Sequence, residues 1–500
     1  MFFPIILYFF LQQTVGATDP VGSSEDACIS ESSYHRLLGS KTLYCDARQF
    51  VNSPNDRPYS FDKESLEERH SQLLKRNCEP IVFFFFGRHS ARFPEGDDAD
   101  IYNKHMIQIQ DALRQHVDES TCPQKVAELF NWKPKMQLEH ESLITHIGSL
   151  EQRDIARRFK KLYPQFFDAK QSDIKLGVTN YLRTAQTALE FLKEVDNFDL
   201  SSDCGKNSSP IHDINHQKYS SDRLRSHPCY QRMMGAYVRR ELSFDEECKA
   251  IMRVKKFKYP LVERARNPKV VQSIIESIST RLGFSGENSP IDFEMLNSMY
   301  DNCRFETALS EGSIWCKLFT EKELKVLEYI EDVNTYIKGA YGSEARPAQS
   351  CPVIKDLLET FISATHRSGD VYPQKQSVFY FSHATPMKKV LAVFGLFTDM
   401  DSFSESAISE FERTLKIPED RNWRISGVCP FSANMAFILY RCQNPGTDRV
   451  EHKVLSTVTE RPVRLSGCQD IVCDSETFFR NYEPLRDCDL RKICAKRNQD

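Results

Sequence analysis

A run of six apolar residues, Ile81 to Phe86, constrains the fold more than any other part of this chain. It is too short to cross a membrane, since a spanning helix needs about 20 apolar residues. It also lacks the alternation of apolar and polar side chains that a strand with one wet face would show. Such a run is typical of a strand buried on both faces, in a parallel or mixed sheet with helices above and below it.

Three basic side chains, Arg88, His89 and Arg92, follow this strand closely. Open α/β sheets bind their ligands at the carboxyl ends of the strands. Arginine offers paired donors to phosphate oxygens, and a neutral histidine nitrogen can attack phosphorus. The loop therefore indicates a phosphate site, with an exposed basic turn as the alternative interpretation.

Two later segments repeat this arrangement of an apolar strand followed by a basic side chain. Residues 173–179 (DIKLGVT) predict a strand, and Arg183 then opens a helix that runs to Leu192. Residues 376–381 (QSVFYF) predict another strand, and His383 follows it. Because the carboxyl ends of parallel strands meet at one edge of a sheet, we expect Arg183 and His383 beside the first basic loop.

The helix that follows His383 is expected to begin at Thr385. Threonine is a good N-cap residue, and Pro386 suits the first turn of a helix. A histidine at a helix N-terminus lies where anions bind, which again indicates a phosphate site.

The remaining pattern divides the chain into a core and an insertion. Residues 18–193 and 345–445 carry the predicted strands and are expected to form the two parts of one α/β core. Between 194 and 344 amphipathic helices prevail, which we expect to cover the active edge of the sheet as a cap. Thr320 and Glu323 form a capping-box signature before one of these helices, Leu324 to Ile337. Further helices are expected at 63–75, 101–117 and 138–167, and paired strands at Arg424–Pro430 and Asn434–Tyr440.

The first 17 residues, Met1 to Ala17, resemble a secretory signal, although the usual positive charge near the start is absent. A buried N-terminal element is the alternative. No later run is long enough to span a bilayer. Asn207 begins a glycosylation sequon, which suits a loop of a secreted protein. The sequence therefore predicts secretion.

Sixteen cysteines, an even number, also favour an oxidising compartment with several disulfides. Four of them gather in residues 446–500, a segment with little core of its own: Cys468, Cys473, Cys488 and Cys494. We expect cross-links to hold this segment in place, although the pairing cannot be derived from the sequence.

The net charge of the chain argues against nucleic acid and anionic membranes as partners. The formal net charge of −4 produces no global field that would attract nucleic acid or an anionic membrane. A basic run could line a pocket for a highly phosphorylated ligand, although a solvated surface is the simpler interpretation: Arg253, Lys255, Lys256 and Lys258. His212 and His216 have metal-ligand spacing, but they lack carboxylate or thiol companions and we interpret them as surface histidines. No metal and no protein partner is predicted.

The segment Arg88 to Pro94 (RHSARFP) resembles the R-H-G-x-R-x-P signature of the histidine acid phosphatases. Arg183 to Ala188 (RTAQTA) matches a second pattern of that family, R-T-x-x-[ST]-A. Further segments, among them FSHATPMKKVLAVFGLF and WRISGVCPFSANMAFILYRC, are similar to the branch of multiple inositol polyphosphate phosphatases. Together these segments span most of residues 78–494.

This resemblance implies a phosphoglycerate-mutase-like α/β fold, with a mixed or parallel sheet flanked by helices and an inserted α-helical cap. It implies hydrolysis of phosphomonoesters of inositol polyphosphates such as phytate, with 2,3-bisphosphoglycerate as a further substrate. His89 would be the nucleophile that is transiently phosphorylated, and Arg88, Arg92, Arg183 and His383 would hold the phosphate. The resemblance implies no metal or other cofactor, and the partner is a small phosphorylated molecule.

Two residues depart from the family pattern. Ser90 stands where the family usually has glycine, which places a side chain beside the nucleophile. Thr385 stands where relatives carry the acid that protonates the leaving alcohol, and loss of a general acid costs about 10²–10⁴ in rate. Glu95, Asp97 and Asp98 are candidate substitutes. The alternatives are a slower enzyme with a different substrate, or a pseudophosphatase that binds inositol polyphosphates. We favour an enzyme because the nucleophile and the phosphate-binding cations remain.

Overall fold

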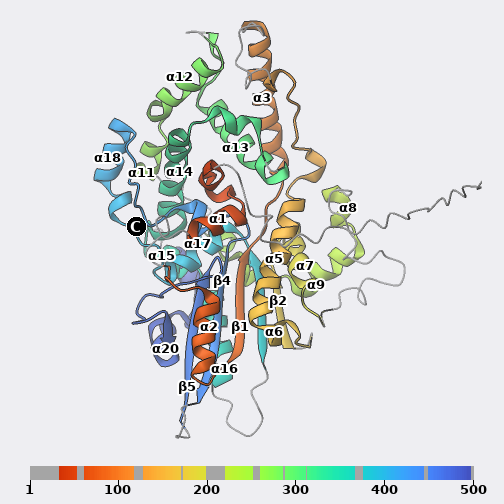
Figure 1. Cartoon of the computed structure of the whole chain (residues 1–500), viewed down its shortest axis with the longest axis vertical. Coiled ribbons are helices and arrows are strands. Elements are labelled where there is room, and N and C mark those ends of the chain that lie inside the picture. Colours follow the sequence, from red (N-terminus) through yellow and green to blue (C-terminus); the bar gives the residue numbers. More distant parts are fainter. Residues whose placement is uncertain are drawn as a thin grey trace, which may run out of the picture.

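In the part of the chain that the structure describes, seven strands form a mixed sheet in the lower half of the molecule (Figure 1). The strand order is β2-β3-β1-β4-β5-β6, and β7 pairs with β5. The strands β2, β3 and β1 are parallel, whereas β4 and β5 run antiparallel to their neighbours. The strands are β1 (Cys78–Arg88), β2 (Ile174–Val178), β3 (Gln376–Ser382), β4 (Asn434–Gln443), β5 (Val450–Val458), β6 (Arg461–Pro462) and β7 (Val472–Asp474). The expected α/β fold with a mixed sheet is confirmed.

The structure is a computed structural model. It describes residues 33–52, 61–116, 128–170, 173–196, 198, 220–251, 259–284, 288–310, 312–365, 375–443 and 449–496. The expected signal segment, the sequon at Asn207, the pair His212 and His216 and the basic run from Arg253 to Lys258 lie outside the described residues.

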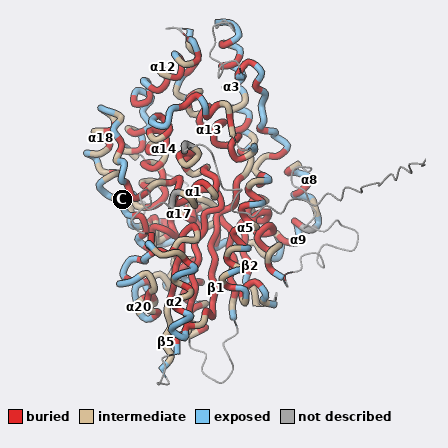
Figure 2. The backbone as a smooth tube through the Cα atoms, viewed as in Figure 1, coloured by how far each residue is buried: buried red, intermediate tan, exposed pale blue. Residues whose placement is uncertain are grey.

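The consecutive phenylalanines of β1 fill both faces of the sheet, because successive side chains of a strand point to opposite sides. Phe83 and Phe85 belong to a core with helices α5 (His146–Leu162), α6 (Pro164–Phe167) and α7 (Leu182–Leu192). Phe84 and Phe86 belong to a second core with α16 (Cys351–Thr365), α17 (Ala384–Val393) and α20 (Ser475–Tyr482). Figure 2 shows the strands as the buried centre of the molecule. The strand buried on both faces, predicted from Ile81 to Phe86, is confirmed.

The carboxyl ends of the three parallel strands lie level with one another. Arg88 at the end of β1 pairs with Ser382 at the end of β3. Phe381, one residue earlier, pairs with Val178 at the end of β2. The segments that leave these three strands therefore start side by side, and they carry the predicted site residues.

A group of helices lies beyond this edge of the sheet in the upper half of Figure 1. It comprises α3 (Gly96–His116), α11 (Pro260–Ala265), α12 (Gln272–Arg281), α13 (Phe293–Ser310), α14 (Glu321–Thr335) and α18 (Glu405–Thr414). Helix α13 packs against α3, and α11 packs against α14 and α18. Thr320 and Glu323 form the predicted capping box of α14. Helix α3, which precedes residue 194 in the chain, thus joins the group formed by later helices.

The remaining helices are short. Helix α9 packs against β2 and α7, and α2 packs against β1. The bounds are α1 (Tyr44–Asn52), α2 (Leu66–Lys75), α8 (Ser221–Arg225), α9 (Pro228–Tyr237), α10 (Phe244–Ile251), α15 (Ala345–Ala348), α19 (Ile425–Val428) and α21 (Leu490–Lys496).

Two predictions about local structure were wrong. The predicted strand Arg424–Pro430 contains the helical turn α19, since Asp332 accepts a hydrogen bond from the backbone N–H of Ile425 at 2.8 Å and so holds the start of this turn. Thr385 is not the N-cap of α17. His383 takes that position without a side-chain hydrogen bond, because β3 ends at Ser382 and the chain turns into the helix at once, which places Thr385 in the first turn.

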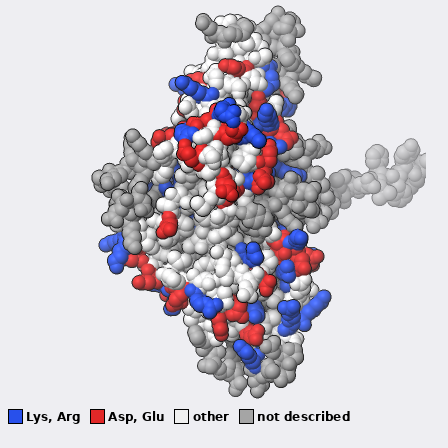
Figure 3. Space-filling view, turned by 90° about the vertical axis from the view of Figure 1, so that its left-hand side faces the viewer, with Lys and Arg blue, Asp and Glu red and all other residues white. Residues whose placement is uncertain are grey.

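Disulfides hold the C-terminal segment, as predicted. Five disulfides join described cysteines: Cys78–Cys442, Cys248–Cys494, Cys303–Cys316, Cys351–Cys488 and Cys468–Cys473. Two of them tie the tail to α10 and α16. In the part of the chain that the structure describes, no helix is both long and apolar enough to cross a membrane. On the face in Figure 3, basic and acidic residues are interspersed.

Candidate active site

Two histidines lie close together at the carboxyl ends of the parallel strands. His89 follows β1 and His383 follows β3, and the centroids of their rings lie 5.5 Å apart. Arg88 and Arg92 flank His89 in sequence, and Arg183 lies in the first turn of α7, shortly after β2. Each of the five is mostly or half buried. The structure thus brings together all the basic residues that the sequence placed in the site.

The imidazole of His89 is held in one orientation. Its Nδ1 lies 3.0 Å from the carbonyl oxygen of Ser90. A carbonyl can only accept, so Nδ1 carries the proton and Nε2 keeps its lone pair. Burial, followed by the charges of Arg88 and Arg183, holds the pKa of His89 well below its usual range. The ring is therefore neutral, with a lone pair on Nε2.

The guanidinium of Arg88 is anchored on one side. One terminal nitrogen donates to the carbonyl oxygens of Ser40 and Cys429, the latter at 2.9 Å. The guanidinium carbon lies 4.7 Å from the ring centre of Phe431. The Nε–H of Arg88 is buried and has no hydrogen-bond partner among the described residues. This donor is available to a ligand.

Arg92 and Arg183 face one another across a carboxylate. One Glu95 oxygen lies 3.6 Å from Arg183 and 4.0 Å from Arg92. The buried Nε–H groups of both arginines lack hydrogen-bond partners within the described structure. Burial, and then repulsion from Arg92, lowers the pKa of Arg183 to about 10. Cations crowded in this way are stabilised by an incoming anion.

His383 is oriented by residues that follow β2. Its Nε2 lies 2.9 Å from the hydroxyl of Thr179, and its ring meets the ring of Tyr181 edge-on at 4.9 Å. The Tyr181 hydroxyl donates to Glu246 of α10 at 2.8 Å. Burial, followed by the charges of nearby arginines, holds the pKa of His383 well below its usual range. Its Nδ1 is buried without a partner in the described structure, which leaves this nitrogen for a ligand.

Sequence reasoning missed several residues of this site. Thr179 and Tyr181 directly follow β2, so the rule about strand ends that selected Arg183 would also have selected them. Phe431 and Ser40 carry no such signal, because both reach Arg88 from segments far away in the chain.

The Ser90 side chain contacts helix α7. Its hydroxyl lies 3.2 Å from the hydroxyl of Thr187 in α7, and its backbone N–H donates to the same oxygen at 3.0 Å. Ser90 is fully buried in this position. Both polar groups of Ser90 are therefore engaged by α7.

A buried carboxyl supports the loop behind His89. The backbone carbonyl of His89 accepts a hydrogen bond from Ser432 N–H, and the Ser432 hydroxyl donates to Glu151. Glu151 also accepts from the backbone N–H of Tyr44 at 2.6 Å. Burial raises the pKa of Glu151 to about 8. A protonated carboxyl is thus favoured here, which avoids a buried charge beneath the site.

None of the candidate substitute acids has a buried side chain that is also clear of ion pairs with Arg92 and Arg183. Glu95 is more than half exposed and faces Arg183 and Arg92, so its carboxylate is engaged by these two guanidiniums. Asp97 is exposed in the first turn of α3. Burial, followed by repulsion from Glu95, raises the pKa of Asp98, although its side chain is also exposed.

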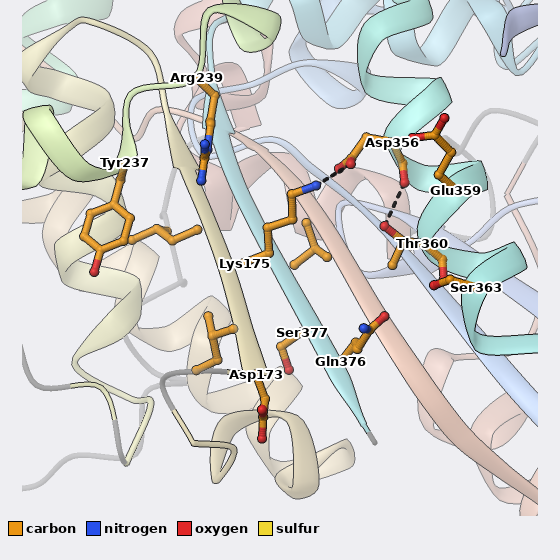
Figure 4. Close-up of a pocket in the computed structure, with 13 residues that line it drawn as sticks. Asp173, Lys175, Tyr237, Arg239, Asp356, Glu359, Thr360, Ser363, Gln376 and Ser377 are labelled. Atoms are coloured by element: carbon orange, nitrogen blue, oxygen red, sulfur yellow. Dashed lines mark hydrogen bonds and ion pairs between the residues drawn. The ribbon is translucent and has the colours of Figure 1, made fainter. Parts of the chain in front are cut away.

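A separate pocket of about 570 Å³ lies along β2 and β3, between α9 and α16 (Figure 4). Lys175 forms an ion pair with Asp356 across it. Asp173 and Gln376 line the pocket at or before the amino ends of their strands. No predicted site residue lines it, and it extends toward the end of the strands opposite to the two histidines.

The chain matches known proteins over most of its length. The family model described as Histidine phosphatase superfamily (branch 2) matches residues 86–455. Multiple inositol polyphosphate phosphatase 1 of Drosophila melanogaster is 23% identical over 483 residues, which cover 93% of this chain and 90% of that protein. The protein of that name from Homo sapiens is 21% identical over 472 residues, covering 93% and 89%. The crystal structure of the phytase from D. castellii has a similar fold, with a TM-score of 0.62 at 14% identity and coverage of 96% and 91%.

Proposed function

The chain belongs to the histidine phosphatase superfamily, branch 2, and is a phosphomonoesterase; we propose that it hydrolyses inositol polyphosphates through a phosphohistidine at His89. The observation that carries this proposal is the convergence of three guanidiniums and two neutral imidazoles at the ends of β1, β2 and β3. Each of the three guanidiniums holds a buried Nε–H without a partner in the described structure. Such unsatisfied donors are costly unless a ligand accepts from them.

Binding of a phosphate would satisfy these donors together. Arg88, Arg92 and Arg183 would donate to its oxygens, and His383 would add its free Nδ1. A dianion would also displace Glu95 from Arg183 and Arg92, since it carries more charge toward the same groups. In the transition state negative charge spreads over the phosphoryl oxygens, and fixed cations stabilise it without reorganising.

Nucleophilic attack would come from Nε2 of His89, because Nδ1 is engaged with Ser90. A bond forms between this nitrogen and phosphorus while the bond from phosphorus to the alcohol oxygen breaks. Water then attacks phosphorus, phosphate leaves, and the imidazole is restored. The alcohol oxygen needs a proton in the first step, and Thr385 cannot provide it.

The substrate class follows from similarity to proteins named for inositol polyphosphates and phytate. Charge near the site is in keeping with a polyanion, since Lys249 and Lys388 act electrostatically on His383 and on Cys429 beside Arg88. The smaller polyanion 2,3-bisphosphoglycerate is a second candidate. The disulfides support an oxidising compartment, and we propose that the protein is secreted.

Phosphate release from inositol hexakisphosphate, measured beside direct binding of the same ligand, tests the proposal. We expect both. Binding without release would favour the alternative of a pseudophosphatase, for which the replacement of the usual acid by Thr385 is the specific argument. If the protein neither binds inositol hexakisphosphate nor releases phosphate from it, the proposed substrate class is wrong.

Arg183→Ala is expected to weaken binding of inositol hexakisphosphate by about 1.5–3 kcal/mol, the worth of a hydrogen bond to a charged group. The matched control is Arg157→Ala, which removes an exposed arginine of α5 and should leave binding unchanged. Isothermal titration calorimetry provides the comparison. Equal affinities of the two variants would place Arg183 outside the site.

Thr385→Glu is expected to raise the rate on inositol hexakisphosphate about tenfold at about pH 4 to 5, where a carboxyl is still protonated. An aryl phosphate, which leaves without protonation, should gain much less. The substitution removes no helix cap, because His383 is the N-cap, and a carboxylate suits the first turn of a helix. A gain of equal size on both substrates would contradict a role in protonation.

Both site histidines are expected to stay neutral well below pH 6.5, the usual pKa of the side chain. A lowered pKa in the folded state means that the unfolded chain takes up these protons first, so acid favours unfolding as the pH falls below about 6.5. NMR titration of the imidazole signals, beside thermal melts from neutral to acidic pH, tests this. Titration of both rings near 6.5 would show that burial does not govern them.

A further inference from the structure

The leaving alcohol lacks the family's usual acid, and we propose that the ammonium of Lys388 donates the proton in its place. The inference rests on the proposed function, since it names the group that completes the same reaction. Lys388 lies in α17 three residues after Thr385, and four features of the structure support this role.

The first feature is the shared face of Lys388 and Thr385 in α17. Residues three apart in a helix are neighbours on its surface. Both side chains are half-buried, whereas Pro386, Met387 and Lys389 between and beside them are buried. Helical side chains lean toward the N-terminus, so the side chain of Lys388 leans toward the turn that holds Thr385.

The second feature is the proximity of Lys388 to a phosphate-binding arginine. Cys429 links the two, because its carbonyl accepts from Arg88 at 2.9 Å and its sulfur lies 3.8 Å from the carbonyl oxygen of Ala384. The Cys429 thiol is subject to the charges of both Arg88 and Lys388. Cys429 thus contacts both Arg88 and the first turn of α17, the helix that carries Lys388.

The third feature is a gap that accommodates the ammonium. Gly339 belongs to a π-helical segment, Tyr336–Tyr341, which packs against α17. A β-carbon at position 339 would lie 3.0 Å from Cε and 3.2 Å from Nζ of Lys388. Any other residue there would press on the end of the lysine. π-helical turns are frequent at functional sites.

The fourth feature is an ammonium with no close acidic partner. Among the described residues, none forms an ion pair or a hydrogen bond with the Lys388 ammonium. Glu331 is engaged by Arg304. The groups that act on Lys388 through their charge are Cys429, Glu331, Arg88 and Asp245. Burial lowers the pKa of Lys388, with a further contribution from Arg88, and this makes the ammonium a stronger acid than an exposed lysine.

The proposed step is balanced in protons and bonds. As the bond between phosphorus and the alcohol oxygen breaks, an N–H of Lys388 transfers its proton to that oxygen and the neutral amine remains. The alcohol departs. Water then attacks the phosphohistidine, the amine accepts a proton from this water, and the release of phosphate returns both groups to their initial states.

Two substitutions, Lys388→Met and Lys388→Arg, test the role in the full-length protein. Methionine keeps the length of the side chain, and arginine keeps the charge but gives up a proton far less readily. Both should lower kcat on inositol hexakisphosphate about 100-fold or more, and lower kcat on p-nitrophenyl phosphate less than about tenfold. Lys322→Met, an exposed lysine of α14, is the matched control and should change neither.

Rescue provides the sharper readout. Thr385→Glu in the Lys388→Met background should restore most of the lost rate on inositol hexakisphosphate, with activity that falls as the pH rises above about 5. In the wild type the activity should fall at a higher pH, as the Lys388 ammonium deprotonates. Circular dichroism confirms that each variant is folded.

Several outcomes would overturn the inference. Equal losses on the two substrates, or full activity of Lys388→Arg, would make Lys388 an anchor for a second phosphate rather than an acid. Selective loss in Asp98→Asn instead would assign the proton to Asp98. These results leave the proposed function intact. A wild type that releases no phosphate from inositol hexakisphosphate would remove the proposed function itself.

Discussion

His89→Ala is expected to lower phosphatase activity by about 10⁴-fold or more, because it removes the atom that accepts the phosphoryl group. The fold should survive, since the backbone hydrogen bonds of this residue to Ser382 and Ser432 do not depend on its side chain. Rapid denaturation of the enzyme during turnover of labelled substrate, at alkaline pH where phosphohistidine persists, should trap label in the wild type and none in the variant.

His146→Ala is the matched control for this experiment. His146 is exposed at the start of α5, so its loss should change neither the rate nor the label. Substantial activity in folded His89→Ala would refute the mechanism, whatever the substrate. Label trapped on another residue would move the nucleophile elsewhere.

Arg421→Met is expected to destabilise the protein by about 3–5 kcal/mol, the cost of leaving buried charges without their partner. Arg421 donates to Asp332 at 2.7 Å and to Glu328 at 2.8 Å, and all three side chains are almost completely buried. This cluster joins α14 to the segment that leads into α19 and Cys429. Urea unfolding gives the difference in free energy.

The destabilisation should depend on pH. Burial raises the pKa of Asp332, and loss of Arg421 removes a charge that opposes this shift. A raised pKa in the folded state favours folding at low pH and loses that contribution as the pH rises, so the variant should be closest to the wild type under acidic conditions. Arg413→Met, which breaks an exposed ion pair, should cost less than about 1 kcal/mol at any pH. A similarly small cost for Arg421→Met would show that the buried cluster is dispensable.

Features that depend on local patterns were predictable from the sequence. The apolar run of β1 indicated a strand with two buried faces, and the capping box of α14 follows from two side chains one turn apart. The cross-linking of the C-terminal segment was also predictable, because cysteines form disulfides in an oxidising compartment. Which cysteines pair was beyond prediction, since the partners of Cys488 and Cys494 lie 137 and 246 residues away.

The errors arose where tertiary contacts override local preference. Residues 424–430 are apolar enough for a strand, but the buried carboxylate of Asp332 holds their backbone in a helical turn. Thr385 has the better N-cap side chain, yet the end of β3 sets where α17 begins and places His383 at the cap.

The sequence by itself determined which segments form buried strands and which basic residues follow them, because strand burial and basic loops are local properties. The tertiary structure alone decided which groups are free to act. Thr179 takes one nitrogen of His383 and Ser90 one nitrogen of His89, which leaves the other nitrogen of each ring. The position of Lys388 depends on Gly339, 49 residues earlier. Such assignments are contacts between distant segments, and no local pattern encodes them.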